Sequence, residues 1–245
     1  MTEPQKFFEV PSGIYGIKNE EMLMLTYITV PVGPFQENCR FLINGDNFNA
    51  LICDPGDNAR ELYMLAEKYH LNVRAIILTH GHHDHCGGAA ELAELLHVPV
   101  WGPHRDDEYW LHNLEMQASM FGLEARPPLT PERYFKDGES VDIEGIGEPM
   151  LVLHCPGHTP GQVCYYFAES RLLLSGDVLF AGSVGRSDFP QGDPEQLIKS
   201  IRDKLLILPD DTKVLPGHGG ESTIGREKTG NPYVNCYFDC MRVSN

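Results

Sequence analysis

Short apolar runs alternate with longer segments of helical periodicity along most of the chain. Runs rich in β-branched and aromatic residues, bounded by glycine, proline or asparagine, predict strands. Segments with apolar residues three and four positions apart predict helices. The expected strands span residues 24–30, 39–43, 50–54, 73–79, 150–155, 162–167, 171–175 and 213–215, with a short one at Val100. Strands interleaved with helices in this way predict a layered α/β domain.

Four helices are expected between these strands. Asn58 is placed to cap the first, the second covers residues 88–97, the third covers 105–121, and the fourth precedes the strand at 213–215. The segment 122–138 is irregular and contains proline. The apolar positions expected to pack are Leu62, Leu65, Ala66 and Tyr69 in the first helix, Trp110, Leu111, Leu114 and Met120 in the third, and Leu197, Ile198, Ile201 and Leu205 in the fourth.

Composition narrows the class of protein. No linker-like stretch divides the 245 residues, so we expect one domain over 1–245 with an N-terminal extension at 1–23. The first residues lack the order of a signal peptide and the longest apolar stretch is interrupted, which favours a cytoplasmic protein that makes no membrane contact. A formal charge of −16 opposes a nucleic-acid partner. Seven cysteines without a Cys-x-x-Cys pair indicate reduced thiols.

The densest chemistry is the string His-Gly-His-His-Asp-His at residues 80–85, directly after an apolar run. Side chains alternate in an extended loop, so His80, His82 and Asp84 can share one side while a turn at Asp84 brings His85 around. His83 points away by the same rule and is expected to be structural or to support a ligand, instead of being a ligand itself. Imidazoles with a carboxylate suit Zn, Fe or Mn.

Three further polar residues follow expected strands through glycine-bearing turns: His158 after Pro-Gly, Asp177 after Gly, and His218 after Pro-Gly. Strand ends followed by such loops can hold side chains over a common point. Together with the first string they supply enough ligands for two metals that share one carboxylate. The seven candidate ligands are His80, His82, Asp84, His85, His158, Asp177 and His218.

These strings, at residues 79–85, 156–161, 175–177 and 216–218, resemble the ordered metal motifs of the metallo-β-lactamase superfamily, and Asp-Pro-Gly at 54–56 resembles the aspartate that ends its early strand. Segments 179–190 and 225–232 look most like the compact YcbL-type glyoxalase II proteins. The resemblance implies a four-layer αββα sandwich and hydrolysis of a glutathione thioester, such as S-D-lactoylglutathione to D-lactate and glutathione. Only 16 residues follow Thr229, too few for a separate C-terminal helical substrate domain.

The resemblance also implies a role for each site residue. His80, His82 and His158 would hold one metal, and Asp84, His85 and His218 the other. Asp177 would bridge the two, which makes Asp84 and Asp177 the catalytic carboxylates, and Asp54 would orient a ligand imidazole. The cofactor expected is a pair of divalent ions, zinc first, with iron or manganese as alternatives. The partner expected is a small glutathione thioester, bound by a monomer or small homo-oligomer. The cations expected to contact its carboxylates are Arg186, Arg226 and Lys228.

Other functions compete with this interpretation. Persulfide dioxygenases of the same fold share the Gly-Arg-Ser-Asp-Phe stretch at 185–189 and use one iron, held by the residues that match His80, His158 and Asp177. The complete second ligand set favours the hydrolase. The acidic charge disfavours a nucleic-acid-processing metallohydrolase, and the missing export signal disfavours a β-lactamase. A purely structural metal site is disfavoured because the ligand set leaves room for a reactive water.

Overall fold

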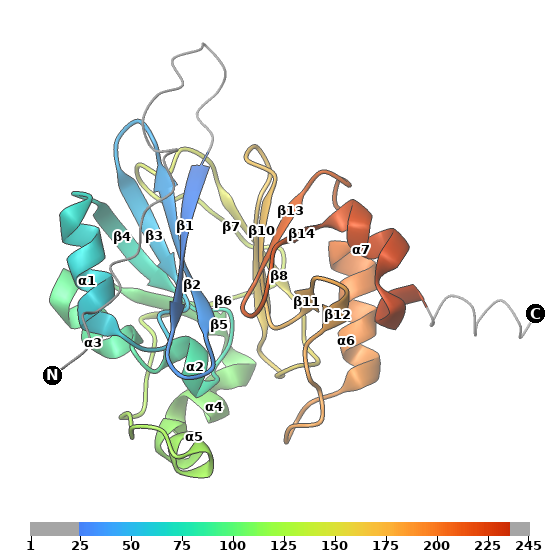
Figure 1. The fold of residues 1–245 in the computed structure, drawn as a ribbon, viewed down its shortest axis with the longest axis horizontal. Helices are drawn as coiled ribbons and strands as arrows, with labels where there is room; N and C mark the ends of the chain where they lie inside the picture. Colours follow the sequence, from blue (N-terminus) through green and yellow to red (C-terminus); the bar gives the residue numbers. More distant parts are fainter. Residues whose placement is uncertain (1–24, 236–245) are drawn as a thin grey trace, which may run out of the picture.

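Two six-stranded sheets face each other at the centre of the computed structural model, which describes residues 25–235, and helices cover both outer faces (Figure 1). This arrangement confirms the four-layer αββα architecture. The expected N-terminal extension at 1–23 and two of the seven cysteines, Cys236 and Cys240, lie outside the described residues. The other five cysteines are free and buried, in agreement with reduced thiols. Within the described part, no helix is long and apolar enough to cross a membrane.

The first sheet has the strand order β1-β2-β3-β4-β5-β6. Its first three strands are antiparallel neighbours, and β3 to β6 run parallel, with helices as the connections between β3, β4 and β5. The strands are β1 Leu25–Val32, β2 Glu37–Asn44, β3 Asn49–Cys53, β4 Asn72–Ile77, β5 Val100–His104 and β6 Arg133–Phe135.

The second sheet has the order β14-β13-β10-β9-β8-β7, with one parallel pair, β10 and β13. The strands are β7 Ser140–Val141, β8 Met150–His154, β9 Val163–Phe167, β10 Leu172–Gly176, β13 Lys213–Pro216 and β14 Ser222–Thr223. A small hairpin of β11 Leu179–Phe180 and β12 Ser183–Val184 stands apart from both sheets.

The alternation of side chains along β3 explains why two sheets stack. Ala50 and Ile52 pack toward the helices, whereas Leu51 and Cys53 pack toward the other sheet. Every residue of β2 and β9 is buried, as expected for central strands covered on both faces. The core therefore has three layers, one between the sheets and one under each helical layer.

The outer helices dock through the apolar positions that the periodicity indicates. Helices α1 Ala59–Lys68 and α3 Ala89–Leu96 cover the first sheet, and α6 Pro194–Ser200 and α7 Ile224–Gly230 cover the second (Figure 1). A π-helical turn, Ile201–Leu205, extends α6 and buries Ile201 and Leu205. Asn58 does precede α1, but its side chain accepts the Gly33 N–H instead of capping the helix.

The helix expected over 105–121 is broken into three parts, which we call the helical insert. They are a 3₁₀ turn at Arg105–Asp107, α4 Glu108–His112 and α5 Leu114–Phe121, with Asn113 as the break because its backbone leaves the helical region. Trp110, Leu111 and Leu114 are buried as predicted, whereas Met120 is exposed and the prediction that it packs in the core is wrong. The segment 122–138 is mostly irregular but contributes β6.

Candidate metal centre

The ligand string leaves the first sheet just after β4. His80 and His82 lie in the connecting loop, and a helical turn, α2 His83–Cys86, begins at His83, one residue earlier than expected. The turn brings Asp84 and His85 together near His218, whereas His80 and His82 lie with His158.

Three imidazoles converge to form what we call the histidine cluster, His80, His82 and His158. Nε2 of His80 lies 3.1 Å from Nδ1 of His82 and 3.2 Å from Nε2 of His158. The His82 and His158 nitrogens are 2.9 Å apart. His158 reaches this point from the loop after β8, on the opposite sheet. The cluster thus joins residues from both halves of the sandwich.

A second group, the carboxylate cluster, contains Asp84, His85 and His218. Oδ2 of Asp84 lies 3.2 Å from Nε2 of His218 and 3.9 Å from Nε2 of His85. Asp177 lies between the two clusters, with Oδ1 at 3.4 Å from His85 and Oδ2 at 3.6 Å from His158. The seven residues predicted from strand ends therefore meet at one place.

Close backbone approach makes this meeting possible. A Cβ atom at Gly217 would lie 2.4 Å from Oδ1 of Asp177 and 2.5 Å from the His85 ring. Only glycine fits there, which explains the Pro-Gly before His218.

Neighbouring groups fix the protonated nitrogen of three ligand candidates. Nδ1 of His158 donates to the Arg186 carbonyl at 2.6 Å, and Nδ1 of His85 donates to Asp54 at 3.0 Å. The Thr79 hydroxyl donates to Asp54 and therefore accepts from Nδ1 of His80 at 3.1 Å. Nε2 of each of these three rings is consequently the nitrogen that faces the clusters and can bind a metal ion when the imidazole is neutral.

The charges of the two clusters differ. Burial lowers the pKa of His80, His82 and His158, so these imidazoles are neutral at neutral pH. Burial raises the pKa of Asp84, but His85 and His218 outweigh it and hold that carboxyl at about 2. The same two histidines, with His158, outweigh burial and keep the pKa of Asp177 below its usual range. Both carboxylates are therefore ionised, and they in turn raise the pKa of His85 and His218.

The donor set fits two divalent cations. Nε2 of His85 and Oδ1 of Asp177 are buried without any hydrogen-bond partner, although buried polar atoms are nearly always paired. Lone pairs also crowd within 3.2 Å in the histidine cluster. Cations would satisfy both groups at once, and this mixture of imidazole and carboxylate suits Zn, Fe or Mn.

Two residues of the helical insert support the ligand loops, and sequence reasoning missed both. Buried Asp107 accepts from the Gly81 N–H at 2.8 Å, the Thr159 hydroxyl at 2.8 Å and the Gly161 N–H at 2.5 Å. Burial raises its pKa to about 6, although these donors act against the rise. Gln117 accepts from the His83 N–H and donates to the Gly81 carbonyl. No local pattern marks them, because their partners lie far away in the sequence.

His83 and the candidate substrate cations are placed around the clusters. His83 belongs to neither cluster, and its Nε2 donates a hydrogen bond to the Glu124 carbonyl at 2.9 Å. Arg186 lines the cavity beside the clusters and forms a two-point ion pair with Asp188, at 2.9 and 3.0 Å. Arg226 and Lys228 do not line this cavity, and Asp210 binds the Lys228 ammonium. The expectation that these two cations contact the substrate is therefore wrong.

Residues 32–218 match the family model described as the metallo-beta-lactamase superfamily. The chain belongs to this superfamily. Among curated members, hydroxyacylglutathione hydrolase GloC of Haemophilus influenzae is 44% identical over 84% of this chain and 96% of its own length. The probable metallo-hydrolase YqgX of Bacillus subtilis is 39% identical over 84% and 96% of the two chains.

Solved structures of the superfamily agree with the fold. TTHA1623, crystallised in a di-iron-bound form, has a TM-score of 0.76 and 39% identity over 84% of this chain and 99% of its own. The B3 metallo-beta-lactamase BLEG-1 has a TM-score of 0.79 and 36% identity over 85% and 99%. Family membership and the two clusters together make this chain a metallo-hydrolase of the superfamily.

Proposed function

We propose that the chain is a dinuclear metal hydrolase of glutathione thioesters, with S-D-lactoylglutathione as the first substrate to test. The observation that carries the proposal is the pair of clusters that share Asp177, which gives donors for two ions and not one. The 44% identity to a hydroxyacylglutathione hydrolase supports the substrate class. A persulfide dioxygenase with one iron would leave Asp84, His85 and His218 without a role.

His80, His82 and His158 would hold one ion, Asp84, His85 and His218 the other, and Asp177 both. Such ions would supply a nucleophile and oxyanion stabilisation at neutral pH, because divalent metals lower the pKa of bound water to about 7 and polarise a carbonyl. Zinc is the ion we propose first, with iron and manganese compatible with the same donors.

The residues around the ligands keep this arrangement ready for the reaction. Asp54, Thr79 and the Arg186 carbonyl hold the imidazole protons on the side away from the clusters. A thiolate leaves without help from an acid, since free thiols have a pKa near about 8.5. Polar side chains that act mainly as ligands are therefore sufficient for thioester hydrolysis.

Arg186 is the one cation that we keep as a substrate contact. Its guanidinium lies over the Phe189 ring at 4.4 Å and is 65% exposed, so a substrate carboxylate could compete with Asp188 for it. We expect Arg186→Ala to raise KM for S-D-lactoylglutathione more than it lowers kcat, with metal content unchanged. Arg171→Ala, which removes an exposed arginine paired with Asp211 elsewhere, is the matched control. A KM effect on uncharged thioesters as large as on this substrate would contradict the contact.

Metal analysis of the purified protein coupled to a substrate panel tests the function. We expect about two equivalents of divalent metal and hydrolysis of S-D-lactoylglutathione, measured as release of free thiol. Oxygen consumption with glutathione persulfide, together with one equivalent of iron, would instead identify a dioxygenase. A β-lactam belongs in the panel because one similar structure is a B3 metallo-beta-lactamase.

A further inference from the structure

A cavity of about 390 Å³ opens directly onto the two clusters. The ligand candidates His82, Asp84, His158, Asp177 and His218 form its floor. Its volume lies within the range of about 300–1,000 Å³ that is typical of small-molecule sites. Whatever reacts at the clusters must therefore lie against the remaining walls of this cavity.

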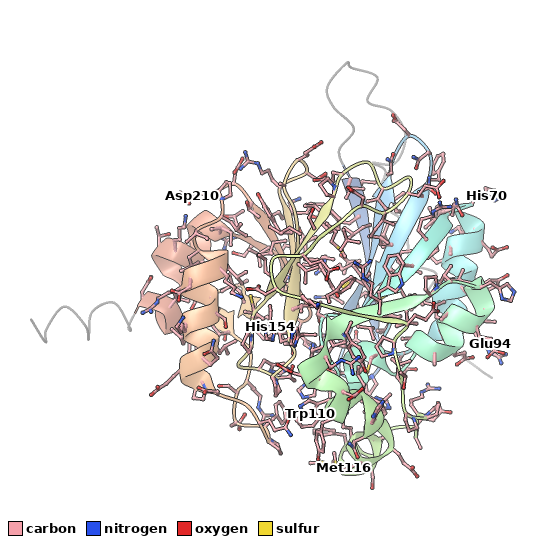
Figure 2. All side chains as sticks on the ribbon, turned by 180° about the vertical axis from the view of Figure 1, so that it is seen from behind. His70, Glu94, Trp110, Met116, His154 and Asp210 are labelled. Carbon is pink, nitrogen blue, oxygen red and sulfur yellow. The ribbon has the colours of Figure 1, made fainter. Side chains whose placement is uncertain are left out.

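Those walls are largely apolar. Trp110 of α4 and Phe189 of the loop before α6 pack edge-on to His82, with ring centres at 4.7 and 5.1 Å. Phe35, from the turn between β1 and β2, meets Phe121 of α5 at 5.6 Å. Figure 2 labels Trp110 and Met116, two wall residues, on the helical insert. The wall is thus assembled from segments far apart in the sequence.

Exposed apolar side chains are concentrated at this cavity. The described residues include nine large hydrophobic side chains that are exposed, and five of them line the cavity: Phe35, Tyr109, Met116, Met120 and Phe121. Scattered exposed hydrophobics are ordinary, but a contiguous group beside a reactive site indicates a ligand surface. Methionines add a surface that adapts to ligands of different shape.

The charge of the walls argues against a purely polar occupant. Arg186 is the only lysine or arginine that lines the cavity among the described residues, so the walls offer a cationic partner to at most one carboxylate of a substrate. Glutathione carries two carboxylates and an ammonium group, which gain little from aromatic rings and methionines. The part of a glutathione thioester that suits this wall is therefore the acyl group on the other side of the scissile bond.

We infer that this cavity is an acyl pocket, and that the enzyme prefers glutathione thioesters with an apolar acyl chain or aryl group over the small, polar lactoyl group. The inference rests on the proposed thioester hydrolysis. In that reaction water adds its oxygen to the acyl carbon, the C–S bond breaks, and the products are a carboxylic acid and glutathione. No oxidant or reductant takes part.

Initial rates on a series of S-acylglutathiones, from acetyl through butanoyl and hexanoyl to octanoyl, test the acyl pocket in the metal-loaded enzyme. Each methylene that leaves water for the wall should raise kcat/KM about fourfold until the pocket is full, which corresponds to ~0.8 kcal/mol per buried CH₂. We expect the hexanoyl ester to exceed S-D-lactoylglutathione by at least about tenfold. Equal kcat/KM along the series, with lactoyl turnover intact, would overturn the acyl pocket and leave the proposed hydrolysis standing.

A pair of matched variants links the effect to the wall. Met120 of α5 lines the cavity and is 65% exposed, whereas Met64 of α1 lies outside it and is 64% exposed. Met120→Asp should flatten the dependence of kcat/KM on chain length, with a much larger loss for the octanoyl than for the acetyl ester, while metal content stays unchanged. Met64→Asp should leave the dependence intact. If kcat/KM depended equally on acyl chain length in the two variants, the helical insert would have no part in substrate selection.

Calorimetry with S-methyl-, S-butyl- and S-hexylglutathione separates the pocket from the reaction, because these thioethers have no scissile carbonyl. Tighter binding with each added methylene is expected and would support an apolar pocket for the group on sulfur. If no thioester is hydrolysed, the proposed function fails, and these affinities alone decide the pocket. The same dissociation constant for the methyl and hexyl compounds would overturn it.

Discussion

Asp54→Asn tests how the chain keeps the lone pair of His85 directed at the carboxylate cluster. In the native side chain, Oδ2 accepts from Nδ1 of His85 at 3.0 Å and from the Thr79 hydroxyl at 2.6 Å. Oδ1 accepts from the Thr79 backbone N–H at 2.7 Å. A carboxamide of the same shape has one accepting end and one donating end, so it cannot serve all three donors.

The variant has two orientations, and each has a cost. With its oxygen toward the Thr79 N–H, the amide nitrogen opposes Nδ1 of His85, and the imidazole must carry its proton on the metal-facing nitrogen. With its oxygen toward His85, the Thr79 N–H is buried without an acceptor. An unsatisfied buried donor costs about 1–3 kcal/mol, and this bounds the loss in both cases. As an affinity change it is about 5- to 140-fold at 1.4 kcal/mol per factor of ten.

Two measurements distinguish the orientations. Competition with a chromophoric chelator should show the affinity loss if His85 changes its proton position. Urea unfolding of the metal-free protein should show the free-energy loss if Thr79 loses its acceptor. Asp57→Asn, on the same loop and partly exposed beside Arg126, is the control and should change neither quantity by more than about 1 kcal/mol. Unchanged affinity and unchanged unfolding free energy in Asp54→Asn would refute the reasoning.

Three further predictions concern the clusters. Asp177→Ala should lower bound metal and abolish turnover while circular dichroism stays native; full metal content with near-normal kcat would contradict its shared position. Asp107→Ala leaves three donors of the ligand loops without an acceptor, so chelator competition should show a metal affinity weaker by about 10–100-fold. Asp106→Ala removes an exposed neighbouring carboxylate and is the control, which should leave the metal affinity unchanged. Burial lowers the pKa of His85 and His218, but nearby carboxylates outweigh it and raise both. Protons therefore compete with metal at higher pH in the carboxylate cluster than in the histidine cluster, whose pKa values are lowered. Metal titrations at decreasing pH should show that the ion in the carboxylate cluster is lost before the ion in the histidine cluster. Simultaneous loss of both ions would contradict this order.

The ligand candidates could be found from sequence because each obeys a local rule. His158, Asp177 and His218 follow a buried strand through a glycine-bearing turn, and the sheets then bring their strand ends together. The strands themselves could be predicted because β-branched runs between turn residues fix them within a few positions. The turn in the ligand string begins one residue earlier than expected, because a single helical turn already starts at His83.

The surroundings of the ligands could not be found in this way. Asp107 and Gln117 act on loops to which no sequence spacing connects them. Met120 fits a helical pattern for core packing, yet it faces the cavity, because α5 stands at the edge of the sandwich and not over a sheet. Apolar periodicity tells which residues avoid water in general, but it does not distinguish a core from a ligand pocket.

The helical insert serves two tasks with different side chains of the same short segments. Asp107 and Gln117 tie it to the ligand loops by buried hydrogen bonds. Its cavity side, with Met116, Met120 and Phe121, makes no such bonds and can change with little loss of stability. Evolution, or a protein engineer, could therefore exchange the substrate range of this enzyme through a few positions on one helix while the hydrolytic chemistry is inherited unchanged.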